Sequence, residues 1–174
     1  MSRGKGKAWE AVCNNSRDAM QQNGLCSWLR MHPPVLIKPD GKAIFTGKGP
    51  PDWILLHKGT SILGDDKDSR KSPWRTKNIK RHQVKAFELH EKNGGIACIL
   101  LRMDDYSRWM IPWKELRKLG DKGTLEIQCG ILVDKKTGEP IGKKWDEKEA
   151  INKKTKMSQM IPYDWLTPLL SIDP

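Results

Sequence analysis

Two carboxylates and an ammonium group are spaced so that a pair of strands could bring them together. Asp65 and Lys67 belong to the triplet Asp65-Asp66-Lys67. Because strand side chains alternate between faces, these two point one way and Asp66 points the other. Asp52 precedes an earlier apolar run. If Asp52 and Asp65 lie on neighbouring antiparallel strands, their carboxylates converge with the ammonium group of Lys67 at one sheet edge.

Such a convergence suits a hard divalent cation. Mg²⁺ takes oxygen ligands and is usually held by one or two carboxylates, with water and substrate phosphate completing its coordination. A lysine beside the ion can orient a water molecule or offset the charge that builds on a phosphorus centre during attack. The three residues therefore favour phosphodiester hydrolysis. Two surface acids and a lysine on an ordinary hairpin are the alternative that the motif alone leaves open.

The element that must position these residues is a β-hairpin. Apolar runs at 53–56 and 61–63 are joined by His57-Lys58-Gly59-Thr60, a four-residue connection with the glycine that a hairpin turn favours. The hairpin places Asp52 at the start of one strand and Asp65 at the end of the next.

A predicted helix upstream carries a third carboxylate. The segment 2–23 predicts a helix that ends at Asn23-Gly24. Its apolar stripe consists of Ala8, Trp9, Val12, Ala19 and Met20. We place Glu10 in the first turn, where an acid stabilises the helix dipole. Glu10 is therefore either such a stabilising residue or a further ligand of the cation.

A second predicted helix, 76–93, carries a polar residue on its inner face. The inner stripe consists of Ile79, Gln83, Ala86, Phe87 and His90. The amide of Gln83 either satisfies a buried backbone group or faces the same edge as Asp65 and Lys67.

Basic residues follow the acid-lysine cluster directly. A positive loop beside a metal site is what a phosphate backbone requires, and we favour this interpretation over an ordinary solvated face. With the basic N-terminus, the predicted DNA-binding residues are Arg3, Lys5, Lys7, Arg70, Lys71, Trp74, Arg75, Lys77, Lys80 and Arg81.

The length of the chain predicts one domain over 1–174. A turn-rich excursion at 32–49 is expected to project from the sheet edge. A C-terminal extension at 121–174 is expected to pack on the core. The other predicted elements are strands at 25–31, 43–46, 96–103, 108–111 and 124–133, a short helix at 112–119 and a turn at 135–138.

Composition narrows the function classes. The chain has 32 Lys and Arg residues against 21 acids, a net charge of +11, which favours nucleic acid as a partner before a membrane. Its four cysteines lack the CxxC spacing of a zinc site, so we expect reduced thiols. No segment is apolar enough for a signal region or a membrane span, and we expect a cytoplasmic protein.

In combination, these motifs resemble the PD-(D/E)xK nuclease superfamily, here as Pro51-Asp52 followed by Asp65-Asp66-Lys67. More narrowly, the chain is similar to the RecU-type Holliday-junction resolvases of bacteria and their phages. The resemblance covers roughly residues 2–120. The residues that carry the narrower likeness are Arg3-Gly4 before Glu10, His32-Pro33-Pro34-Val35, and Asn78, His82 and Gln83.

The resemblance implies an α/β fold with a restriction-endonuclease-like core, in which a mixed central β-sheet is flanked by helices. It implies a homodimer that uses Mg²⁺ or Mn²⁺ to nick two opposed strands of a four-way DNA junction. Asp52 and Asp65 would be metal ligands, joined by the backbone carbonyl of Asp66. Glu10 would bind a metal directly or through water. Lys67 would position the attacking water and counter charge in the transition state, and Gln83 would support the site or hold that water.

Two departures from the family pattern stand out. Asp65 occupies a position where the family more often has Glu, which should shift the ion by about one methylene without abolishing binding. The excursion at 31–49 is shorter than the RecU stalk. We therefore expect a structure-selective endonuclease that resolves Holliday junctions. The alternatives are another nuclease of the superfamily, of restriction or repair type, and a non-catalytic DNA-binding module.

Overall fold

The computed structural model describes residues 5–45, 47–69, 72–103, 107–145, 148–151, 158–161, 165, 166 and 169. A six-stranded sheet runs through the middle of the molecule, in the order β1-β4-β5-β7-β8-β11. Its strands are β1 (Ser27–Arg30), β4 (Trp53–His57), β5 (Thr60–Asp68), β7 (Ile96–Arg102), β8 (Arg108–Pro112) and β11 (Lys143–Lys144). Because β5 and β7 are parallel while the other neighbours are antiparallel, the sheet is mixed.

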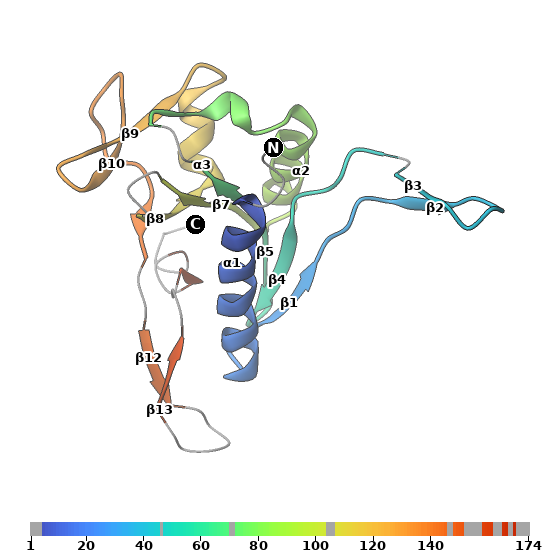
Figure 1. Cartoon of the computed structure of the whole chain (residues 1–174). Helices are drawn as coiled ribbons and strands as arrows, with labels where there is room; N and C mark the ends of the chain where they lie inside the picture. Colours follow the sequence, from blue (N-terminus) through green and yellow to red (C-terminus); the bar gives the residue numbers. More distant parts are fainter. Residues whose placement is uncertain are drawn as a thin grey trace.

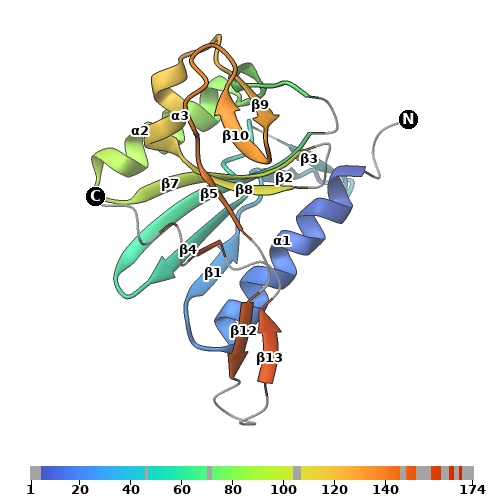
Figure 2. The ribbon, with the colours of Figure 1, turned by 90° about the vertical axis from the view of Figure 1, so that its left-hand side faces the viewer.

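Helices cover both faces of this sheet (Figures 1 and 2). The helix α1 (Lys5–Gln22) lies on one face, and α2 (Arg81–Lys92) and α3 (Trp113–Leu116) lie on the other. Strand β7 contributes to both cores, because Cys98 and Leu100 pack on the α1 side and Ile99 and Leu101 on the α2 side. The predicted α/β architecture with a mixed central sheet flanked by helices is confirmed.

A smaller three-stranded sheet has the order β10-β9-β6. Its strands are β6 (Trp74–Arg75), β9 (Thr124–Gln128) and β10 (Ile131–Asp134). The predicted single strand at 124–133 is therefore wrong, because the chain turns at Cys129 and Gly130, whose φ angles are 49° and 76°. The strand was mispredicted because Cys129 is not a typical residue for a left-handed backbone conformation.

The turn-rich excursion contains a hairpin of β2 (Val35–Ile37) and β3 (Ala43–Phe45). Figure 1 shows this hairpin extending away from the rest of the molecule. A second hairpin joins β12 (Lys148–Ile151) to β13 (Ser158–Ile161). Near the end of the chain, Trp145, Trp165, Leu166 and Leu169 are buried in the core on the α1 side. Within the described residues, no helix has the length and apolar character needed to span a membrane.

Two of the three predicted helices differ from the structure near their N-terminal ends. The segment 76–93 is not one helix, because η1 (Thr76–Asn78) is a 3-10 turn and the extended backbone of Ile79 and Lys80 separates it from α2. The first turn of α1 contains no acid, so our placement of Glu10 there is also wrong. After α3, the predicted helix at 112–119 continues as the 3-10 turn η2 (Arg117–Leu119).

Candidate active site

The β4–β5 hairpin brings Asp52 beside Asp65. Trp53 pairs with Gly64 in the antiparallel register, so the residues just beyond this pair are Asp52 and Asp65. At the other end, the strands pair up to His57 and Thr60. The connection is thus the two residues Lys58 and Gly59, both with positive φ (46° and 86°), rather than the predicted four. Two positive φ angles match the twist of the flanking strands, which explains the tighter turn.

The carboxyl groups of Asp52 and Asp65 lie close enough to influence each other's ionisation. Asp65 is completely buried and Asp52 is partly buried. Burial, followed by the charge of Asp65, raises the pKa of Asp52 to about 7. The pKa of Asp65 is also raised, chiefly by burial, although Lys67 opposes the shift. Two negative charges in this position are therefore unfavourable without a compensating cation.

Lys67 and Gln83 complete the cluster from β5 and α2. The ammonium group of Lys67 forms an ion pair with Oδ2 of Asp65 and donates to Oε1 of Gln83 over 3.3 Å. Nε2 of Gln83 donates to Oδ1 of Asp65 over 2.7 Å. Oε1 of Gln83 also accepts the backbone N–H of Lys80 at 3.1 Å. Gln83 thus does both things that the sequence left open, because it caps the backbone before α2 and faces Asp65 and Lys67.

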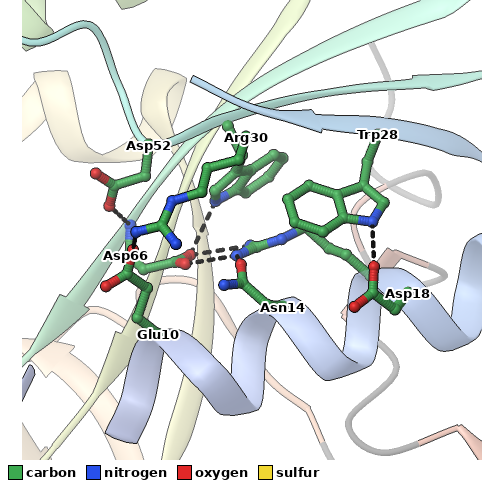
Figure 3. Close-up of polar contacts among 9 residues, drawn as sticks. Glu10, Asn14, Asp18, Trp28, Arg30, Asp52 and Asp66 are labelled. Atoms are coloured by element: carbon green, nitrogen blue, oxygen red, sulfur yellow. Dashed lines mark hydrogen bonds and ion pairs between the residues drawn. The ribbon is translucent and has the colours of Figure 1, made fainter. Parts of the chain in front are cut away.

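Asp66 points toward α1, as Figure 3 shows, and strand alternation places Asp65 and Lys67 on the other face. Its carboxylate accepts two hydrogen bonds from Arg17, at 2.7 and 3.1 Å, and one from Nε1 of Trp53 at 2.8 Å. Its backbone N–H, by contrast, donates to Oδ2 of Asp52 at 2.9 Å. Because the N–H and C=O of one strand residue project to the same side, the Asp66 carbonyl also lies on the Asp52 side.

Glu10 lies next to this cluster but is engaged elsewhere. It forms an ion pair with Arg30 of β1, and Figure 3 shows the pair beside Asp52 and Asp66. Among the described residues, no three His, Cys, Asp or Glu side chains are grouped so that they could hold a metal ion. The ligand set in this arrangement is therefore the pair of aspartates, and Glu10 would have to leave Arg30 to join them.

The donor set nevertheless fits a hard divalent cation. Oδ2 of Asp65 is buried, and the Lys67 ammonium group forms an ion pair with it. The neighbouring donors are also oxygens, from the Asp52 carboxylate and the Asp66 carbonyl. Burial, followed by neighbouring negative charge, raises the pKa values of the two aspartates, and a cation would offset both effects.

The predicted DNA-binding residues are only partly described. Arg75, Lys77, Lys80 and Arg81 are exposed on the segment that leads into α2. Trp74 is 2% exposed and packs in the core on the α2 side, so its assignment as a DNA-contacting residue is wrong. Lys5 and Lys7 lie in α1. Arg3, Arg70 and Lys71 lie outside the described residues.

Three residues near the site were missed by the sequence reasoning: Arg17, Arg30 and Trp53. Arg17 stands seven residues after Glu10, which is two helical turns, so their shared helix face could have drawn attention to it. Arg30 and Trp53 gave no comparable signal, since each reaches its partner only through tertiary folding.

The family of the chain follows from a match between residues 4–163 and the model of the family described as RecU, recombination protein U. The chain belongs to the recombination protein U family. This confirms the resemblance inferred from the sequence, and the match extends beyond residue 120 into the C-terminal third. No curated protein sequence matches the chain.

Among solved structures, the chain is similar to Hjc of Archaeoglobus fulgidus, a Holliday junction resolvase from an archaeal hyperthermophile. The two share 13% sequence identity and a TM-score of 0.44, over 76% of this chain and 91% of that one. Membership of the recombination protein U family rests on the family match alone.

Proposed function

We propose that this protein is a metal-dependent endonuclease that resolves four-way DNA junctions by hydrolysing phosphodiester bonds. The observation that carries the proposal is the convergence of Asp52, Asp65, Lys67 and Gln83 at one edge of the sheet. If a protein of the recombination protein U family hydrolyses DNA, it needs carboxylates to hold a cation and a positive group beside the phosphate, and this cluster supplies both. The net charge of +11 supports a polyanionic substrate.

Asp52, Asp65 and the carbonyl of Asp66 would hold Mg²⁺, with Mn²⁺ as a substitute. When bound, the cation would polarise the scissile phosphate and make a water molecule a better nucleophile. Asp52 and Asp65 bind it best as carboxylates, and its charge would oppose the burial and the charge of Asp65 that raise the pKa of Asp52. Glu10 would join as a further ligand, directly or through water, once Arg30 releases it.

Lys67 would orient the attacking water and offset the charge that develops on the phosphate. Asp65 and Gln83 fix its ammonium group, and its side chain is 19% exposed, so it can reach a substrate outside the core. Gln83 would hold Lys67 and Asp65 in register, because its amide bonds to both. In this proposal, Asp52 and Asp65 bind the cation, Lys67 offsets the charge on the phosphate, and the amide of Gln83 holds Asp65 and Lys67 in place.

The exposed cations before α2 would hold the DNA backbone beside the site. Lys80 joins the two regions directly, because its backbone N–H donates to Gln83 while its side chain is exposed. Phosphate contacts of this kind position a duplex without reading its sequence, which suits an enzyme that selects branched DNA by shape. Cutting two opposed strands requires two sites, so we propose a homodimer whose two-fold axis matches that of the junction.

The deciding experiment incubates the protein with a synthetic four-way junction and with a matched linear duplex, each with Mg²⁺ and with EDTA. We expect symmetric nicks in the junction alone, and only with Mg²⁺. Cleavage of the linear duplex at a preferred sequence would instead indicate a restriction-type enzyme. Junction binding without cleavage under every condition would indicate a non-catalytic module.

A matched pair of variants tests the assignment of the site. Asp52→Asn should reduce junction cleavage at least about 100-fold while leaving binding in EDTA intact, since it removes one of the two aspartate ligands. Glu88→Gln, at an exposed position on the outer surface of α2, should cleave at the wild-type rate. Equal cleavage by Asp52→Asn and the wild type would contradict the site.

A further inference from the structure

Arg17 is a charged side chain at the centre of the molecule, only 1% exposed. Its guanidinium group lies between the indole rings of Trp28 and Trp53, 5.0 and 4.8 Å from their centroids. It donates to both carboxylate oxygens of Asp66 and to Oδ1 of Asn14. Burial lowers the pKa of Arg17, but Asp66 outweighs burial and the pKa is raised, so the group stays charged.

Stability alone does not account for this pair. Removing two charges from water is unfavourable, and replacing a buried ion pair by apolar residues of similar volume is often neutral or stabilising. The side chain of Asp66 is as buried as that of Arg17, at 2% and 1% exposure. An apolar pair between Trp28 and Trp53 would fill the same space without two buried charges, and its main cost would be the acceptor lost to the Trp53 indole N–H.

What the pair does provide is a fixed geometry behind the candidate active site. Asp66 contacts the segment that carries Asp52 twice, because its N–H donates to the Asp52 carboxylate and its own carboxylate accepts from the indole of Trp53. A bidentate contact between a guanidinium group and a carboxylate has one preferred orientation. Arg17 thereby fixes Asp66, and Asp66 fixes the Asp52 carboxylate.

The same contact sets the rotation of α1. Glu10, Asn14 and Arg17 follow one another at helical spacing and lie on one side of the helix, as Figure 3 shows for the first two. Tying Arg17 to β5 therefore holds Glu10 toward the Asp52 side of the sheet. The acid of α1 and the acid of β4 are thus positioned by one buried pair.

We propose that the Arg17–Asp66 pair is a positioning element, which sets the Asp52 carboxylate and the orientation of Glu10 for binding a divalent cation. The inference rests on the metal-dependent function proposed above and assigns two residues on the far face of the sheet to it. Neither side chain touches the reacting atoms in this role. Both act through Asp52 and Glu10.

The test replaces both charges by apolar side chains, in the double variant Arg17→Met/Asp66→Leu. We expect it to fold, because the apolar side chains fill the volume of the pair and no unpaired charge is left behind. Its affinity for Mn²⁺ alone, measured by calorimetry without DNA, should be at least about tenfold weaker, and turnover at saturating Mn²⁺ should fall to a similar extent. Wild-type Mn²⁺ affinity and wild-type turnover in this folded variant would overturn the proposal.

A control variant removes a comparable ion pair from the same strand. Arg102 donates to both carboxylate oxygens of Asp68, at 2.9 and 2.7 Å, and this pair joins β5 to β7. We expect Arg102→Met/Asp68→Leu to bind Mn²⁺ as the wild type does. A loss equal to that of the first variant would show that any buried charge on β5 has this effect, and would overturn the specific role.

Arg17→Lys keeps the inference testable if the double variant does not fold. Lysine retains the charge but cannot make the bidentate contact, so we expect a folded protein with several-fold weaker Mn²⁺ binding. Unchanged Mn²⁺ binding would again contradict the proposal. Because this measurement uses no DNA, it decides the inference even if the wild type cuts neither junction nor duplex, in which case the proposed function alone fails.

Discussion

Adjacent residues of β5 point to opposite faces of the sheet and contact different helices at the candidate site. Asp65 and Lys67 face α2 and meet Gln83, whereas Asp66 faces α1 and meets Arg17. The pleat of one strand therefore separates the chemistry from its support. The alternation could be read directly from the sequence, but the partner of Asp66 could not, because Arg17 lies 49 positions away and an arginine in a helix is usually solvated.

Asp52 makes the stability of the metal-free protein depend on pH. Its pKa is about 7 when folded against an ordinary value of 3.8, so the native state holds a proton that the unfolded state has lost between these values. The stability associated with this proton is present below pH 4 and is lost as the pH rises through 7. Asp52→Asn removes the repulsion, and we expect it to stabilise the metal-free protein at pH 8 by at least about 1 kcal/mol.

Thermal melts in EDTA at pH 5 and pH 8 check this expectation. The advantage of Asp52→Asn over the wild type should be larger at pH 8, since the wild-type carboxyl is largely protonated at pH 5. Adding Mg²⁺ at pH 8 should stabilise the wild type and not the variant. An advantage that is equal at both pH values would show that Asp52 titrates normally.

Lys67 can be separated from metal binding by its own substitution. Lys67→Ala should lower turnover about 100-fold or more, because an ammonium group aimed at developing negative charge acts mainly in the transition state. Mn²⁺ affinity should stay within a few-fold of the wild type, since lysine is not a ligand. Single-turnover cleavage and calorimetry measure the two quantities, and a normal rate would exclude Lys67 from the chemistry.

At the scale of elements, the β4–β5 hairpin depends on one glycine. Gly64 lies opposite Trp53, and a Cβ at Gly64 would lie 2.0 Å from Cζ2 of the indole ring. The absent side chain therefore makes room for Trp53, which in turn donates to Asp66. The sequence indicated the hairpin but not this contact, because the need for glycine arises only once the two strands are paired.

We expect Gly64→Ala to destabilise the protein by about 2–3 kcal/mol, because overpacking displaces a completely buried indole. Urea denaturation monitored by tryptophan fluorescence measures the loss. Gly130→Ala, in the β9–β10 turn, is a comparison in which a Cβ would meet nothing within 4 Å and only the positive φ of 76° is unfavourable. A smaller loss in Gly64→Ala than in Gly130→Ala would contradict the packing argument.

The predicted helix at 76–93 shows where local patterns stop being informative. Its apolar stripe correctly placed Gln83 and Phe87 on the inner face. The pattern could not reveal the extended backbone at Ile79 and Lys80, because the amide of Gln83 satisfies the N–H of Lys80 and thereby begins the helix later. The same residue that supports the candidate site thus also sets the helix boundary.

At the scale of the whole molecule, the net charge predicted a nucleic-acid partner, but it could not predict which basic side chains are exposed to such a partner. Position in the fold decides this, and Trp74 illustrates the difference. In sequence it lies within the basic segment, yet it pairs with Leu125 in the smaller sheet and is buried. Arg75, the next residue, is exposed, as expected for successive residues of one strand.

Removing the charges of Arg75 and Lys77 should weaken junction binding and reduce its salt dependence. Each phosphate contact releases counterions, so the slope of log K against log[salt] should fall by about 1–2 in Arg75→Gln/Lys77→Gln. Fluorescence anisotropy in EDTA at several salt concentrations gives the slope. Lys135→Gln/Lys136→Gln, in the turn after β10, is the charge-matched control, and equal slopes in all three proteins would assign Arg75 and Lys77 to solvent.

At the base of the excursion that carries the β2–β3 hairpin, the N–H of Met31 donates to the carbonyl of Asp52 over 2.9 Å. The tip of the hairpin is closed by its own bonds, from Lys38 N–H to Lys42 and from Gly41 N–H to Lys38. Residues at the tip can therefore be exchanged, or a longer tip grafted from a relative, without moving the strand that follows. In this architecture, the outline of the hairpin can diverge between lineages while the strands that carry Asp52 and Asp65 keep their pairing.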